Sequence, residues 1–134
     1  MRIFKTKNFD KFARKERVTD AQLIEAVIDI ESGLFEGDLG GGVLKKRLAA
    51  IGRGKSGSYR SVVAFRCEDR TVFMFGYAKN TVKKSGKEIT DEELKEYRAF
   101  AKVLFSINLD TLSANSKALI EVKTKASRKI DNGE

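Results

Sequence analysis

Residues 43–66 read VLKKRLAAIGRGKSGSYRSVVAFR, and this stretch decides the fold. Two short runs rich in hydrophobic and β-branched residues, 43–50 and 59–65, lie on either side of a glycine-rich segment. Such a pattern predicts two antiparallel strands joined by a loop. Because side chains alternate along a strand, Lys45 and its neighbour Lys46 are expected on opposite faces of the first one.

A further strand is predicted at 71–78, after a turn at 68–70. Alternation gives this strand an aromatic face, which consists of Phe73, Phe75 and Tyr77. The strand at 59–65 has an aromatic face as well, and pairing the two inward predicts a sheet with one dry side. Arg60 then points to the other side, where no packing purpose explains it.

Helical patterns flank these strands. Thr19 and Gln22 have the spacing of a capping box, and a 3.6-residue hydrophobic repeat predicts a helix that ends near Gly33. A second capping box, Thr90 with Glu93, begins another helix. The remaining predicted elements are a strand over 2–5, a helix over 8–15, a glycine-rich turn over 37–42, helical turns over 109–116 and a last strand over 118–122.

Positive charge is concentrated in residues 43–87, where twelve Lys or Arg face two acidic residues, a local charge of +10. The rest of the chain holds fifteen Lys or Arg and seventeen Asp or Glu, so the whole excess of +8 lies in this third of the chain. Such a cluster marks an electrostatic footprint for a polyanion, and nucleic acid is the partner that fits best. A solvated basic surface without a partner is the alternative.

Composition limits the chemistry further. The chain of 134 residues is expected to form one domain over 1–134, with a polar tail from about 123. It has no histidine and a single cysteine, Cys67, so we expect no imidazole catalysis, no metal, no cofactor and no internal disulfide. Neither a membrane-spanning run nor a signal-peptide core is evident, which predicts a cytoplasmic protein.

Two nucleotide-binding motifs match parts of the glycine-rich segment but fail in context. The glycines of 52–57 have the spacing of the dinucleotide fingerprint, and 54–56 resemble the end of a P-loop. Both motifs require a helix to follow, and the P-loop requires glycine where Ala49 stands. The strand predicted at 59–65 follows instead, so both interpretations are excluded.

The same segment and its flanks resemble the RelE/HigB toxin family of bacterial toxin–antitoxin modules. The resemblance rests on GVLKKR at 42–47, GRGKSGSYR at 52–60 and FGYAKN at 75–80, followed by a helix that opens in Glu-Leu. It covers roughly residues 20–122. It implies an α+β fold, in which N-terminal helices pack on a small, twisted, mostly antiparallel sheet, as in RelE-like and microbial RNase-like toxins.

The resemblance also implies an activity. Family members commonly cut messenger RNA on the ribosome, use Lys, Arg and Tyr in place of His, and are silenced by a cognate antitoxin. The predicted function is therefore an mRNA interferase, a metal-independent endoribonuclease. The predicted catalytic residues are Arg60, Lys45, Lys46, Arg47 and Lys79. The predicted RNA- and phosphate-binding residues are Arg53, Lys55, Lys83, Lys84 and Tyr77.

These residue types suit RNA cleavage. The 2′-hydroxyl of RNA is the nucleophile, so the protein must supply a base, charge stabilisation at phosphorus and an acid for the leaving oxygen. The planar, permanently charged guanidinium of Arg60 fits the second task. A lysine crowded by other cations has its ammonium form disfavoured and approaches the role of base, a condition that Lys45 and Lys46 meet beside Arg47.

Two alternatives keep part of this interpretation. A ParE-like toxin that inhibits DNA gyrase would have the same fold without nuclease activity. A non-catalytic nucleic-acid-binding module would use the cations only to grip phosphate. Cations in the glycine-rich loop favour phosphate chemistry over gyrase inhibition. The expected partners are messenger RNA, the ribosome and a helix-turn-helix or acidic antitoxin.

Overall fold

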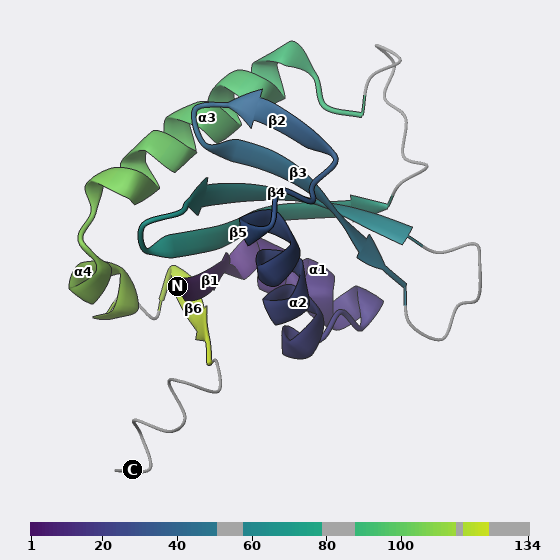
Figure 1. Ribbon diagram of the computed structural model, residues 1–134, viewed down its shortest axis with the longest axis horizontal. Coiled ribbons are helices and arrows are strands. Elements are labelled where there is room, and N and C mark those ends of the chain that lie inside the picture. The colour runs from purple at the N-terminus through teal and green to yellow at the C-terminus, as the bar shows by residue number, and fades with distance from the viewer. Residues whose placement is uncertain (51–57, 79–87, 115–116, 124–134) are drawn as a thin grey trace.

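The computed structural model describes residues 1–50, 58–78, 88–114 and 117–123. The strands are β1 (Arg2–Thr6), β2 (Gly37–Gly40), β3 (Val43–Ala49), β4 (Ser58–Arg66), β5 (Arg70–Ala78) and β6 (Leu119–Val122). The helices are α1 (Lys7–Glu16), α2 (Asp20–Glu31), α3 (Asp91–Ser106) and α4 (Leu109–Ala114). The strands form a six-stranded sheet in the order β2-β3-β4-β5-β1-β6 (Figure 1). Only the β1–β5 pair is parallel among the described strands, so the predicted α+β fold with a mostly antiparallel sheet is confirmed.

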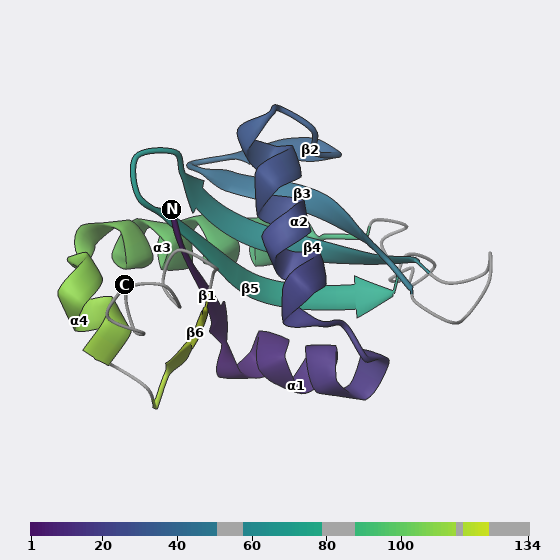
Figure 2. The ribbon, with the colours of Figure 1, turned by 60° about the horizontal axis from the view of Figure 1, so that its bottom comes forward.

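Helices cover both faces of the sheet. Helices α1 and α2 pack on one face, where Phe9, Leu23 and Phe73 are fully buried. Helices α3 and α4 pack on the other face, around Phe4 and Val62. Figure 2 shows α2 in front of the sheet, α3 behind it and α1 below β5 at the bottom of the view. The prediction of a single dry side is wrong, because the apolar stripe of α3 buries the second face as well.

A β-bulge reverses part of the aromatic face predicted for β5. Consecutive residues 62–63 of β4 pair with Phe75 and Phe73, which leaves Met74 as an extra residue on β5. Phe73 therefore packs in the core under α1 and α2. Phe75 and Tyr77 lie on the α3 side, where the Phe75 ring is 5.6 Å from that of Tyr97 on α3.

The helix ends follow their local sequence signals. Both predicted capping boxes are present: the Thr19 hydroxyl accepts from the Gln22 N–H, and the Thr90 hydroxyl accepts from the Glu93 N–H. Gly33, at a positive φ of 85°, follows the carboxyl end of α2 as expected. Among the described residues, no helix has the length and apolar character that crossing a membrane requires.

The glycine-rich segment 37–42, expected to be a turn, begins with the edge strand β2. Gly37, Asp38 and Gly40 pair with β3, and the turn itself consists of Gly41 and Gly42. At Gly42, φ is +81° and an added Cβ would lie 2.6 Å from the ring of Phe105 on α3. Glycine is therefore required where α3 crosses this turn.

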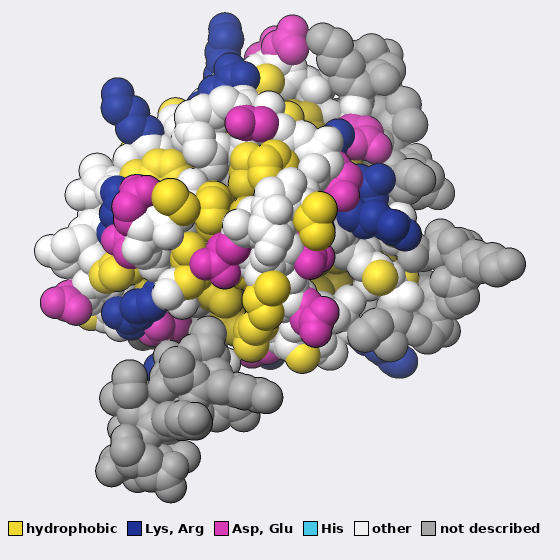
Figure 3. Space-filling view, in the orientation of Figure 1, with side chains coloured by type: hydrophobic (Ala, Val, Ile, Leu, Met, Phe, Trp, Pro, Cys, Tyr) yellow, Lys and Arg dark blue, Asp and Glu magenta, His cyan; other side chains and the backbone are white. Residues whose placement is uncertain are grey.

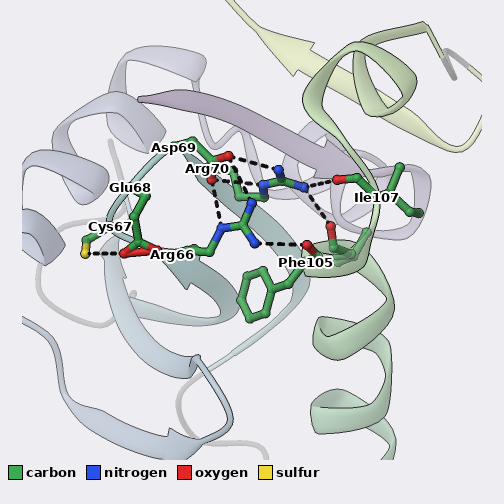
Figure 4. A network of polar contacts seen from close by, with 8 residues as sticks. Arg66, Cys67, Glu68, Asp69, Arg70, Phe105 and Ile107 are labelled. Atoms are coloured by element: carbon green, nitrogen blue, oxygen red, sulfur yellow. Dashed lines mark hydrogen bonds and ion pairs between the residues drawn. The ribbon is translucent and has the colours of Figure 1, made fainter.

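Two arginines, at the end of β4 and at the start of β5, bind the carboxyl end of α3 (Figure 4). Arg66 donates from Nη1 to the Phe105 carbonyl at 2.9 Å. Arg70, whose side chain is buried, donates from Nη1 to the Leu104 carbonyl at 2.9 Å and also to the Ile107 carbonyl. Because α3 has no basic residue in its last turn, these guanidinium groups supply the cations that favour a helix carboxyl end.

Asp69 links the two arginines. Its carboxylate accepts hydrogen bonds from Arg70 and from Arg66 at 2.9–3.0 Å. These hydrogen bonds, that of Arg70 foremost, hold the pKa of Asp69 well below its ordinary range. The network fixes the position of α3 over the sheet. It therefore also determines which part of this sheet face α3 leaves uncovered.

Candidate functional site

Basic residues of β3 and β4 lie side by side on the sheet face that carries α3. Arg47 is the pairing partner of Arg60 across β3 and β4, and Arg60 is in turn the partner of Tyr77 on β5. These three residues form one row across three neighbouring strands, which we call the arginine row. Lys45 lies two residues before Arg47 and points to the same face, where its ammonium is 3.5 Å from the carboxylate of Glu88.

The arginine row is not explained by stability. Like charges directly opposite one another on neighbouring strands repel and destabilise the sheet. Arg47 is exposed and Arg60 is half-buried. Within the part of the chain that the structure describes, neither guanidinium forms an ion pair with a carboxylate. Two guanidinium groups held in this way suit bidentate binding of phosphate oxygens.

Lys46 lies on the opposite face, as alternation predicts. Its side chain is 8% exposed, and its ammonium lies 3.2 Å from Asp29 of α2. It also donates a hydrogen bond to the Leu34 carbonyl at 3.1 Å. The structure therefore does not bring Lys46 together with Arg60; it places Lys46 as an anchor between β3 and α2.

A carboxylate, that of Glu88, lies beside the arginine row. Glu88 accepts a hydrogen bond from the Tyr77 hydroxyl at 3.1 Å through the same oxygen, Oε1, that faces Lys45. Burial raises the pKa of Tyr77, and the negative charge of Glu88 raises it further, while Arg60 opposes the shift. The phenol is thus a neutral hydrogen-bond donor at neutral pH and not a base.

Glu88 was not predicted as a site residue. It lies outside the motifs that carry the family resemblance, and no local pattern marks it. It reaches Lys45 only because the start of α3 packs beside β3, a contact between residues far apart in the chain. Sequence reasoning could have found it only by placing α3 on the sheet.

Half of the predicted site residues lie outside the described residues: Arg53, Lys55, Lys79, Lys83 and Lys84. They belong to segments 51–57 and 79–87, which connect β3 to β4 and β5 to α3. The strand ends from which these segments leave are adjacent in the sheet, since Ala49 pairs with Ser58, and Tyr59 pairs with Ala78. These attachment points lie directly beside the arginine row.

Helix α2, on the other side of the sheet, has the opposite charge. Helix α2 contains four acidic residues and no Lys or Arg. Figure 3 shows hydrophobic and acidic side chains intermixed on the side that carries this helix. The negative charge of α2 repels a polyanion, whereas the arginine row attracts one.

An apolar hollow lies apart from the cations. It measures about 590 Å³ and lies between α3, α4 and strands β5 and β6. Phe75 and Phe100 line it, with 39% and 41% of their surface exposed. None of the predicted site residues that the structure describes lines this hollow, so it is separate from the arginine row.

Comparison with known families places the chain beside a toxin family. A family model described as "RelE toxin of RelE / RelB toxin-antitoxin system" matches residues 1–122. The match includes every described strand and helix, and it extends the predicted resemblance to β1 and α1. A search of curated proteins gives no significant match.

Proposed function

Because the chain belongs to the RelE toxin family of toxin–antitoxin systems, we propose that it is an endoribonuclease that cuts messenger RNA on the ribosome without a metal ion. Family membership implies a toxin with a cognate antitoxin of the RelB type. Ribosome-dependent cleavage, the HigB branch and a cytoplasmic location belong to the proposal.

The arginine row is the observation that carries this function. It sets Arg47 against Arg60 in an arrangement that weakens the sheet unless an anion lies between or above the two side chains. Val62 and Ala64, farther along the same face of β4, are fully buried, whereas Arg60 is only half-buried. Helix α3 thus covers β4 as far as Val62 and leaves Arg60 partly exposed, so RNA can reach the arginine row.

Each cation has a proposed task. Arg60, at the centre of the row, stabilises the charge that develops on the scissile phosphate, and Arg47 holds the same phosphate from β3. Lys45 is an ammonium close enough to the row to give a proton to the leaving 5′-oxygen. The cations outside the described residues, Arg53, Lys55, Lys79, Lys83 and Lys84, are proposed to extend the grip on the RNA backbone.

Cleavage by the purified protein tests the proposal. We expect the protein, mixed with ribosomes that carry a defined messenger RNA, to produce internal cuts that primer extension can map. In cells that express the toxin without its antitoxin, pulse labelling should show that protein synthesis falls before DNA synthesis. Intact RNA together with early arrest of DNA synthesis would reject the ribonuclease and support a ParE-like gyrase inhibitor.

A further inference from the structure

We infer that Glu88 is the general base of the proposed ribonuclease, and that Tyr77 and Lys45 hold its carboxylate in position. This inference rests on the proposed function. It adds an acidic residue to a set of predicted catalytic residues that are all Lys or Arg. The geometry that carries it is the contact of one carboxylate oxygen with two donors, Tyr77 at 3.1 Å and Lys45 at 3.5 Å.

Glu88 is accessible beside the arginine row. Tyr77, which orients the carboxylate, is the cross-strand partner of Arg60. The side chains of Glu88 and Lys45 are 30% and 27% exposed. Both line a hollow of about 490 Å³ on the α3 face. A nucleotide whose phosphate lies on Arg60 can thus present its ribose to this carboxylate.

The contact with Lys45 does not by itself explain why a carboxylate lies on this face. An ion pair as exposed as that of Lys45 with Glu88 contributes only about 0–1 kcal/mol to stability. A negative charge on a face that only bound RNA would repel phosphate and lower affinity. A carboxylate that is kept there, and oriented by the neutral hydroxyl of Tyr77, has the properties of a proton acceptor.

The chemical step balances with these groups. Glu88 takes the proton of the 2′-hydroxyl, the 2′-oxygen bonds to phosphorus, and the bond from phosphorus to the 5′-oxygen breaks. The Lys45 ammonium gives its proton to the 5′-oxygen, which leaves a 2′,3′-cyclic phosphate and a free 5′-hydroxyl. The proton on Glu88 then passes to the Lys45 amine across their 3.5 Å contact, and both groups return to their starting states.

The substitution Glu88→Gln tests the inference, because it keeps the shape of the side chain and its ability to accept from Tyr77. We expect single-turnover cleavage to slow by about 10²–10⁴-fold, the usual contribution of general acid–base catalysis. Binding of uncleaved RNA should stay equal or tighten, since a negative charge is lost. Glu92→Gln is the matched control, because Glu92 is an exposed acid at the start of α3, and it should cleave at the wild-type rate.

A pH profile gives an independent readout. The wild-type cleavage rate should rise with pH on the acidic side as the base loses its proton, and Glu88→Gln should lose that rise. Tyr77→Phe should keep it and slow cleavage less, because it only releases the carboxylate from its orientation. If Glu88→Gln does not fold, a wild-type profile that is flat on the acidic side overturns the inference.

The outcomes separate the two proposals. If the wild type cuts RNA and Glu88→Gln cuts it equally fast or faster, Glu88 is not the base and the ribonuclease proposal stands. If the wild type cuts no RNA with ribosomes present, the proposed function fails and the inference fails with it. Slow cleavage by Glu88→Gln with unchanged RNA binding supports both.

Discussion

At the scale of single residues, the cations of β3 divide into two kinds by the face on which they lie. Lys46 is buried and bound to α2, whereas Lys45 and Arg47 lie on the partly exposed α3 face. Charge alone does not separate them. Their burial and their binding partners distinguish them. Substitution of the two kinds should therefore affect stability differently.

Lys46→Ala is expected to lower the free energy of unfolding by about 1–3 kcal/mol. It removes the buried ammonium that binds Asp29 and the Leu34 carbonyl, and Asp29 is itself 47% exposed, so the loss should be smaller than for a fully buried pair. Arg47→Ala is the matched control on the next residue and should change stability by less than about 0.5 kcal/mol. Urea unfolding of both variants measures this, and equal stabilities would show that Lys46 is no anchor.

At the scale of secondary-structure elements, the positions of α3 and β5 determine which residues meet. The capping boxes at Thr19 and Thr90 were predictable, because capping depends on residues three apart. The bulge at Met74 was not, because a bulge arises from how two strands pair and has no local pattern here. The same limit explains Glu88, which lies beside Lys45 only after α3 has docked.

The arginine row also combines features that the local sequence predicts with features that depend on how the elements pack. Alternation along β3 correctly separated Lys46 from Lys45, and the motif at 52–60 singled out Arg60. Neither signal revealed that α3 covers the second face of the sheet as far as the arginine row. An amphipathic pattern shows which side of a helix is buried, but not which face of a sheet that helix covers. The sequence therefore predicted the fold class and the alternation along β3, but not the elements that surround Arg60.

Removal of the Asp69 carboxylate tests the joint between the β4–β5 turn and α3. Asp69→Asn should destabilise the protein at pH 7, because Arg66 and the buried Arg70 lose their counter-charge. The pKa of Asp69 is lowered in the folded state, so its contribution is present above the unfolded pKa of about 3.9 and is lost as the pH falls below that.

Urea unfolding from pH 7 to pH 2 measures this dependence. The stability difference between wild type and Asp69→Asn should shrink as the pH falls below about 4. Glu31→Gln, an exposed acid at the end of α2, is the control and should show a small difference throughout. A difference for Asp69→Asn that is independent of pH would contradict the ion-pair explanation.

Two glycine substitutions test the contact of α3 with the β2–β3 turn. Gly42 and Gly33 both have positive φ, but an added Cβ meets the Phe105 ring at 2.6 Å only at Gly42, whereas nothing lies within 4 Å at Gly33. Gly33→Ala should therefore cost about 1 kcal/mol from backbone strain alone. Gly42→Ala should cost about 1–3 kcal/mol more, because the ring must move. Equal losses in thermal or urea unfolding would show that α3 does not pack closely on this turn.

At the scale of the whole molecule, the distribution of charge follows the way in which the helices cover the sheet. The acidic helix α2 lies on one side of the sheet, and the arginine row lies on the other, where the cover over β4 ends. The segments that carry the remaining predicted cations leave the sheet beside this row. One end of one face is thus the proposed place of RNA cleavage, and Arg60 is at its centre.

The measurement that tests this claim most directly is cleavage of messenger RNA on programmed ribosomes by Arg60→Ala, with thermal melting of each variant alongside. Arg14→Ala is the control, because the Arg14 side chain is 80% exposed on α1, away from the row. We predict that Arg60→Ala melts like the wild type and cuts about 10²–10³-fold more slowly, and that Arg60→Lys recovers only part of the rate. Cleavage by Arg60→Ala at the wild-type rate, or a loss of activity that only reflects unfolding, would contradict the account.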